Sequence, residues 1–178
     1  VGLVVRWDTP GGKTIRPLTR GPAGWTIGAM PSPRPLYNLT ELLARPGARL
    51  FVAEGEKAAD ALSVLGLLST TSAGGAQAAG KTDWGPLTGR RVVVLPDHDD
   101  AGEHYARDVA RLALAAGAAD VRIVRLADRW ELPPGGDAAD LVESTQPDGY
   151  DALRREIERL ADAAERVEAV GAGRSDAY

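Results

Sequence analysis

The 178-residue sequence has no cysteine, only two histidines and no apolar run of about 18 residues, the length that spans a membrane. The lack of cysteine excludes disulfides and any thiolate-bound zinc. The two histidines, His98 and His104, are isolated, so we do not expect a histidine-based metal cage. Any metal would then have oxygen ligands, which favours Mg²⁺ or Mn²⁺ and no zinc.

We do not expect a signal peptide, because the first residues have neither an apolar core nor a cleavage site. We therefore expect a cytoplasmic protein without a membrane partner. The sequence begins with valine, and we expect it to be a module of a longer polypeptide.

The composition is that of a folded globular chain, with 44% hydrophobic and 26% charged residues. Its length fits one domain with a small appendage. The net charge of −4 hides an asymmetry. Residues 1–49 hold seven basic and two acidic side chains, about +5, and the rest of the chain is about −9. A basic segment beside an acidic centre suits a polyanionic ligand, although a solvated basic hairpin would have the same composition.

The first 48 residues form the basic, β-rich N-terminal segment. We expect strands at 3–7, 13–18 and 25–27, separated by turns rich in Gly and Pro. Three prolines in 31–35 exclude helix there, and 36–44 is predicted as a short helix with Asn38 or Thr40 as its N-cap.

Residues 49–146 alternate between strand and helix patterns. Short apolar runs predict strands, and apolar residues at helical spacing predict helices. The expected order is strand 50–53, helix 56–65, strand 70–73, a loop or broken helix at 77–86, strand 92–95, helix 101–116 and strand 121–126. This alternation predicts an α/β fold with about four mainly parallel strands and flanking helices.

The remainder of the chain is simpler. Residues 128–147 are predicted to be loop-rich, and 147–170 to contain an amphipathic helix with an apolar stripe from Tyr150 to Val167. We expect residues 171–178 to be a flexible tail.

Three acidic runs stand at or just after predicted strand ends: 53–57, 96–102 and 135–140. Because ligands collect beyond the carboxyl ends of parallel strands, we expect the runs to converge. Asp97 and Asp99, two residues apart in an extended segment, would point the same way and could share one cation. Glu54 would be a third ligand or a general acid/base.

Each run also has a purely structural interpretation. An Asp-x-Asp before a helix is often an N-cap, and Asp137 and Asp140 would cap another helix. By the same reasoning His98 and His104 would be surface residues. The combination of the three runs is what indicates a metal site.

The three runs resemble a Toprim domain. Within that family they are most similar to the primases and primase-helicases of phages, plasmids and bacteria. The resemblance rests on Glu54–Lys57, on Val92–Gly102 and on Gly136–Leu141, and it covers about 49–144. It implies a Rossmann-like sheet and catalytic carboxylates. In this interpretation Glu54, Asp97 and Asp99 are catalytic and, together with Asp137, bind Mg²⁺ or Mn²⁺; Asp140 is a weaker ligand candidate.

The same resemblance implies a DNA primase module that makes RNA primers by nucleotidyl transfer on single-stranded DNA. Its partners would be the DNA template, nucleoside triphosphates and a replicative helicase in cis or in trans. Lys57 and Lys81 would contact phosphate. Trp7 or Trp25 would stack on bases or belong to the hairpin core. The expected DNA-binding cations are Arg6, Lys13, Arg16, Arg20 and Arg34.

The sequence departs from the family pattern in three places. Glu56 replaces the aromatic residue common in bacterial primases, no zinc ribbon is encoded, and Gly11–Thr14 lacks the first glycine of a Walker loop. A metal-dependent nuclease and a non-catalytic nucleic-acid-binding module attached to a helicase remain open as alternatives. A topoisomerase is not expected, because the chain is too short for the separate domain that bears a nucleophilic tyrosine.

Overall fold

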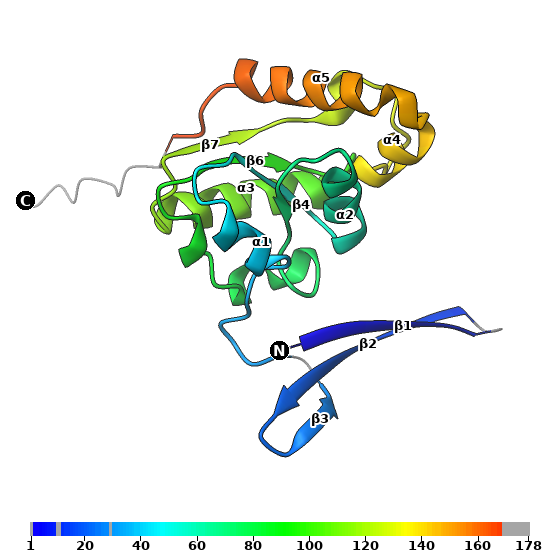
Figure 1. Ribbon diagram of the computed structural model, residues 1–178, viewed down its shortest axis with the longest axis vertical. Helices are drawn as coiled ribbons and strands as arrows, with labels where there is room; N and C mark the ends of the chain where they lie inside the picture. The colour runs from blue at the N-terminus through cyan, green and yellow to red at the C-terminus, as the bar shows by residue number, and fades with distance from the viewer. Residues whose placement is uncertain (1, 10–11, 29, 169–178) are drawn as a thin grey trace, which may run out of the picture.

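The computed structural model describes residues 2–9, 12–28 and 30–168, which form two sheets (Figure 1). The N-terminal sheet is antiparallel and contains β1 (Gly2–Thr9), β2 (Gly12–Gly21) and β3 (Gly24–Ile27) in that order. Leu3 lies opposite Leu18, which in turn lies opposite Ile27. The predicted hairpin and third strand are therefore confirmed.

The second sheet is parallel and has the strand order β5-β4-β6-β7. Its strands are β4 (Leu50–Ala53), β5 (Ser69–Thr70), β6 (Arg91–Leu95) and β7 (Asp120–Ile123). Strands β4 and β6 are buried apolar runs, which explains why they occupy the centre of the sheet. The predicted α/β fold with four parallel strands is confirmed.

Helices cover both faces of this sheet and create two cores (Figure 1). Helices α2 (Glu56–Val64), α4 (Ala138–Ser144) and α5 (Tyr150–Ala163) pack on the face that carries Phe51 and Val93. The other face, which carries Val52 and Val94, is covered by α1 (Leu39–Ala44), the 3₁₀ segment η1 (Ala76–Lys81) and α3 (Asp100–Ala115). The result is a three-layer α/β/α sandwich.

Several predicted boundaries were wrong. Strand β5 ends at Thr70 and not at residue 73, because the Thr71 hydroxyl donates to Glu54 O and the Ser72 hydroxyl to Gly75 O as the chain leaves the sheet. Strand β7 ends at Ile123, and Leu126 begins the 3₁₀ segment η3 (Leu126–Asp128).

Helix boundaries also differ. Helix α4 lies inside the predicted loop region and begins at its N-cap Asp137. Helix α5 ends at Ala163, and Val167 is not in its stripe: the Val167 amide donates to Val121 O, beside β7. Asn38 stands at the N-cap of α1 in a left-handed conformation (φ 54°), without a side-chain cap. The predicted tail 171–178 lies outside the described residues.

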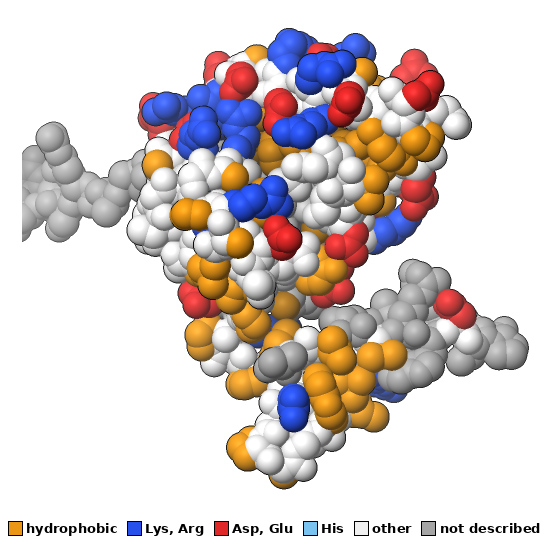
Figure 2. Space-filling model, viewed as in Figure 1, with side chains coloured by type: hydrophobic (Ala, Val, Ile, Leu, Met, Phe, Trp, Pro, Cys, Tyr) orange, Lys and Arg blue, Asp and Glu red, His pale blue; other side chains and the backbone are white. Residues whose placement is uncertain are grey.

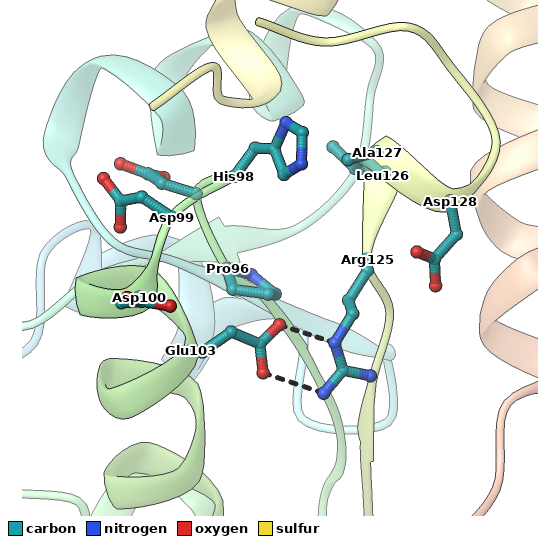
Figure 3. A pocket seen from close by; sticks show the side chains of 10 residues that line it. Pro96, His98, Asp99, Asp100, Glu103, Arg125, Leu126, Ala127 and Asp128 are labelled. Carbon is teal, nitrogen blue, oxygen red and sulfur yellow. Dashed lines mark hydrogen bonds and ion pairs between the residues drawn. The ribbon is translucent and has the colours of Figure 1, made fainter. Parts of the chain in front are cut away.

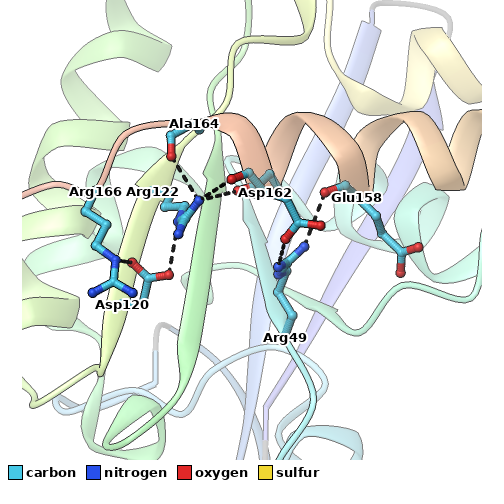
Figure 4. Close-up of polar contacts among 8 residues, drawn as sticks. Arg49, Asp120, Arg122, Glu158, Asp162, Ala164 and Arg166 are labelled. Carbon is cyan, nitrogen blue, oxygen red and sulfur yellow. Dashed lines mark hydrogen bonds and ion pairs between the residues drawn. The ribbon is translucent and has the colours of Figure 1, made fainter.

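The segment after α5 closes the outer edge of the sheet (Figure 4). Arg122 of β7 donates to Asp162 O at 2.7 Å and to Ala164 O at 3.0 Å. Its Nε also pairs with Asp120 at 3.0 Å, and Arg166 contacts the same carboxylate at 3.2 Å. These contacts satisfy acceptors at the end of α5 and cover an otherwise open strand edge.

The first helix is joined to the core by one buried cation. Arg90, only 6% exposed, donates to Leu42 O at 2.6 Å and to Arg45 O at 2.9 Å. Both acceptors lie at the C-terminal end of α1, where carbonyls lack helical partners and favour positive charge. In the described ranges, none of the helices has the length and apolar character needed to cross a bilayer.

Candidate metal centre

The strand order has a switch point between the carboxyl ends of β4 and β6. Strand β5 is added on one side of β4 and β6 on the other, so the direction in which successive strands extend the sheet reverses at this point. Such a switch point is where open α/β sheets bind ligands. Glu54 directly follows β4, and Asp97 follows β6 after one proline.

Glu54 presents an unsatisfied oxygen. Its Oε2 atom is buried and makes no hydrogen bond. Burial raises the pKa of the Glu54 carboxyl, and the charges of Asp99 and Asp137 raise this pKa further. A buried carboxylate oxygen without a donor is costly, so it marks a position where a proton or a cation would be stabilised.

A buried hydroxyl cluster fixes the backbone beneath Glu54. The Tyr105 hydroxyl, on α3, donates to Ala53 O at 3.2 Å and lies 3.1 Å from Ser72 Oγ. The Thr71 hydroxyl donates to Glu54 O at 2.9 Å. Tyr105 is only 3% exposed, and burial raises its pKa, so it stays neutral. These residues were missed from the sequence, because only the tertiary fold brings the three segments together.

Asp97 is the carboxylate with the highest cost of ionisation. Burial raises its pKa to about 7, with further contributions from Glu54, Asp137, Asp99 and Asp140. The loop around Asp97 is held tightly against α3. A Cβ on Gly102 would lie 2.4 Å from Asp97 O, so only glycine fits there.

Asp99 and Asp137 each cap a helix. Asp99 accepts a hydrogen bond from the Gly102 amide at 2.7 Å at the start of α3. Asp137 accepts from the Ala139 amide at 2.7 Å and forms a capping box with Asp140. The interpretation of these aspartates as helix N-caps is therefore confirmed. Each side chain still has carboxylate oxygens that could bind a ligand.

A cavity of about 310 Å³ opens beside these loops (Figure 3). Its wall contains a bidentate ion pair between Arg125 and Glu103. Arg125 Nη2 donates to one Glu103 oxygen at 2.8 Å, and Arg125 Nε donates to the other. This pairing lowers the pKa of Glu103. The lining residues are Pro96 to Asp100, Glu103 and Arg125 to Asp128.

The carboxylates do not form a closed cage. Within the part of the chain that the structure describes, no three Asp, Glu or His side chains converge as a ready-made metal site. Asp99 and Asp137 are turned toward the helix N-termini that they cap. The donor set nevertheless fits a hard divalent cation, because it is made of carboxylate oxygens and Glu54 Oε2 is unpartnered. Burial, together with repulsion from the neighbouring carboxylates, also raises the Asp97 pKa.

The predicted phosphate contacts lie in different places. Lys57, in the first turn of α2, pairs with Glu143 of α4 at 2.9 Å, and Glu143, Asp137 and Asp140 all raise its pKa. Lys57 is thus close to the third acidic run. Lys81 is exposed at the end of η1, and the structure gives it no link to the carboxylates in the described region.

The basic residues predicted to bind DNA also lie in different places. Arg34 donates to Met30 O and to Ala73 O, which ties the N-terminal segment to the core. Arg16 and Arg20 are exposed on β2, and Arg20 lies opposite Trp25, which is 47% exposed. Arg16, Arg20 and Trp25 share one face of the sheet. The side chains of Arg6, Lys13 and Trp7 lie outside the described part of the structure.

Comparison with known proteins places the fold. No family model matches the sequence, and no curated protein matches it. Solved structures do match: the zinc-binding and RNA polymerase domains of the Aquifex aeolicus primase have a TM-score of 0.57 at 18% identity over 92% of this chain and 40% of theirs. The chain has the fold of a bacterial primase catalytic core.

Other primases give the same result. The E. coli primase catalytic core matches with a TM-score of 0.51 at 18% identity, over 93% of this chain and 53% of that chain. A DnaG primase catalytic domain bound to single-stranded DNA matches with a TM-score of 0.50 at 19% identity and the same coverage. The chain spans 40 to 53% of the length of these structures, and the likeness to the primase core is one of fold.

Proposed function

We propose that this chain is the catalytic module of a DNA primase of the Toprim type, which joins nucleotides on a single-stranded DNA template. One observation carries the proposal: in a primase-core fold, Glu54 and Asp97 follow the two strands that flank the switch point, Asp137 lies within electrostatic reach of both, and Glu54 Oε2 is buried without a partner. The proposed similarity to phage or plasmid primases rests on the sequence motifs alone.

In this proposal Glu54, Asp97, Asp99 and Asp137 hold Mg²⁺ or Mn²⁺. A divalent cation held there would supply positive charge that stabilises the phosphoryl group being transferred and would favour loss of a proton from the attacking hydroxyl. Glu54 also acts as a general acid/base through Oε2, because its raised pKa favours binding of a proton. Asp97 gives up its proton when the site is loaded, because a nearby cation favours the carboxylate.

The N-terminal sheet supplies the template surface in the same proposal. Arg16 and Arg20 would contact phosphates, and Trp25 offers an exposed ring on which a base can stack. Leu3 and Ile27 are also exposed on this face, and Figure 2 shows hydrophobic side chains gathered on the N-terminal sheet. The single-stranded DNA seen with one primase of this fold is consistent with this role.

The test is synthesis on a defined template. The chain is incubated with single-stranded DNA, labelled nucleoside triphosphates and Mn²⁺, and the products are resolved by length. We expect short oligomers from the wild type, none from the double variant Asp97→Asn/Asp99→Asn, and wild-type yield from Asp128→Asn, which changes a carboxylate of the same cavity outside the three runs.

Three results would overturn this assignment. An equally active double variant would remove the carboxylates from the chemistry. Shortening of the template without consumption of nucleotides would indicate the nuclease. Binding of DNA that is undiminished in EDTA, with no turnover under either metal, would indicate a non-catalytic module.

A further inference from the structure

His98 joins two of the acidic loops by hydrogen bonds from both its backbone and its side chain. Its amide donates to Gly136 O at 2.9 Å, and its carbonyl accepts from the Gly135 amide at 2.8 Å. Its ring Nδ1 lies 2.9 Å from Leu132 O and 3.2 Å from Pro133 O. The residue between Asp97 and Asp99 thus contacts the loop that leads to Asp137.

The chemistry of these contacts fixes the role of the ring. Both partners of Nδ1 are carbonyl oxygens, which only accept, so Nδ1 must carry the proton. Residues 133 and 134 are prolines and have no N–H to offer within the loop. The loop is also folded tightly, since a Cβ on Gly136 would lie 2.8 Å from Pro133 O. The Gly136 amide donates to Pro133 O at 2.8 Å, and His98 provides a donor to Leu132 O from outside the loop.

A tether is needed here because the loops repel each other. The charge of Asp137 contributes to the raised pKa of both Asp97 and Glu54. The loops are nonetheless close, since a Cβ on Gly135 would lie 3.8 Å from Asp99 Oδ2. Carboxylates on such adjoining loops repel each other and favour separation of the loops unless hydrogen bonds oppose it.

We propose that His98 is a positioning residue that holds the Asp137 loop against the Asp97 and Asp99 loop and so sets the spacing of their carboxylates for cation binding. The proposal rests on the proposed function for its purpose, since it assigns His98 to the support of the same site. His98 acts through hydrogen bonds and not as a ligand. Outer partners of this kind are worth about 10 to 100-fold in metal affinity.

The test uses the full chain in four forms: wild type, His98→Ala, His98→Asn and the control His104→Ala. Asn retains an N–H donor near the position of Nδ1, and His104 is exposed on α3, outside both loops. Mn²⁺ affinity is measured by electron paramagnetic resonance, and hydrogen exchange of the Gly135 amide by NMR.

For His98→Ala we expect about tenfold weaker Mn²⁺ binding and faster exchange at Gly135. His98→Asn should restore both to within about threefold of wild type, and His104→Ala should change neither. A thermal unfolding midpoint close to wild type in all four forms separates positioning from loss of fold.

The proposal is overturned if His98→Ala binds Mn²⁺ like the wild type with unchanged exchange, or if Asn does not rescue. A different result addresses the proposed function: wild-type protein that binds no Mn²⁺ would contradict the metal centre. Exchange at Gly135 then decides the tether by itself, with faster exchange in His98→Ala supporting it and equal exchange overturning it.

Discussion

Asp97 is the residue at which burial and charge work most strongly against ionisation. Its folded-state pKa of about 7 lies above the ordinary value of 3.8. The folded state therefore binds more protons than the unfolded state between about pH 4 and pH 7. Stability falls as the pH rises through this window, and the loss is complete above the folded pKa.

The first prediction follows from the direction of this pH dependence of stability. Asp97→Asn removes the unfavourable charge, so the variant should be more stable than wild type at pH 8 by about 1 to 2 kcal/mol, a figure reduced for partial solvent exposure. Near pH 4, where wild-type Asp97 is protonated in the folded state and close to half protonated in the unfolded state, the two proteins should differ little. Urea denaturation at both pH values measures this.

Asp128→Asn provides the control, because Asp128 lines the same cavity and is exposed. It should show no such dependence on pH. A variant Asp97→Asn that is less stable than wild type at pH 8 would contradict the account of this residue.

At the scale of elements, α3 depends on a close approach to the loop that precedes it. Gly102→Ala would place a methyl group 2.4 Å from Asp97 O, a backbone atom that cannot move without shifting β6. We expect a loss of about 3 kcal/mol in the free energy of unfolding. Gly55→Ala, where nothing lies within 4 Å of the added carbon, should cost far less. Equal costs for the two variants in chemical denaturation would refute this packing argument.

Helix α4 allows the capping and ligand roles of Asp137 to be separated. Asn can still accept the amide hydrogen bonds of the cap, whereas Ala cannot. Asp137→Asn should therefore keep its stability and lose Mn²⁺ affinity. Asp137→Ala should lose affinity and also about 1 kcal/mol of stability. Calorimetric titration and denaturation check the two effects, and unchanged affinity in both variants would limit Asp137 to capping.

The central strands and long helices were predictable from the sequence, because apolar runs such as Val92–Leu95 end at turn residues and α3 has a clear helical period. Short elements were not. Strand β5 has two residues and α4 seven, so their limits are set by tertiary hydrogen bonds and caps. Val167 fitted a helical stripe in sequence, yet it leaves the helix to pair with Val121.

The same limit applies to the site. Strand ends indicated where Glu54 and Asp97 would lie, but the third run does not follow a strand end as predicted, because Asp137 caps α4 well beyond the end of β7. The fold nevertheless brings the three carboxylates within electrostatic reach of one another. The tether of His98 and the hydroxyl of Tyr105 could not be foreseen, because their partners lie 34 and 52 residues away in the chain.

At the scale of the whole molecule, the basic sheet and the acidic centre are expected to act separately. The double variant Arg16→Glu/Arg20→Glu should weaken single-stranded DNA binding by about tenfold or more and lower the salt dependence of log K by about 1.4, for two lost phosphate contacts. Its Mn²⁺ affinity should be unchanged. Fluorescence anisotropy across a salt series measures the first effect.

Arg111→Glu/Arg155→Glu makes the same change of charge on α3 and α5 and serves as the control. If both double variants weaken DNA binding equally, only net charge matters and the N-terminal sheet is not the template surface.

The most direct test of the central claim, that three loops form one divalent-cation site, is a carbon-detected NMR titration of the Asp97 carboxyl with and without Mg²⁺. We predict a midpoint near pH 7 without Mg²⁺ and a clear fall in that midpoint when Mg²⁺ is added, because the cation favours the carboxylate. A midpoint near 4 that Mg²⁺ does not move would contradict the claim.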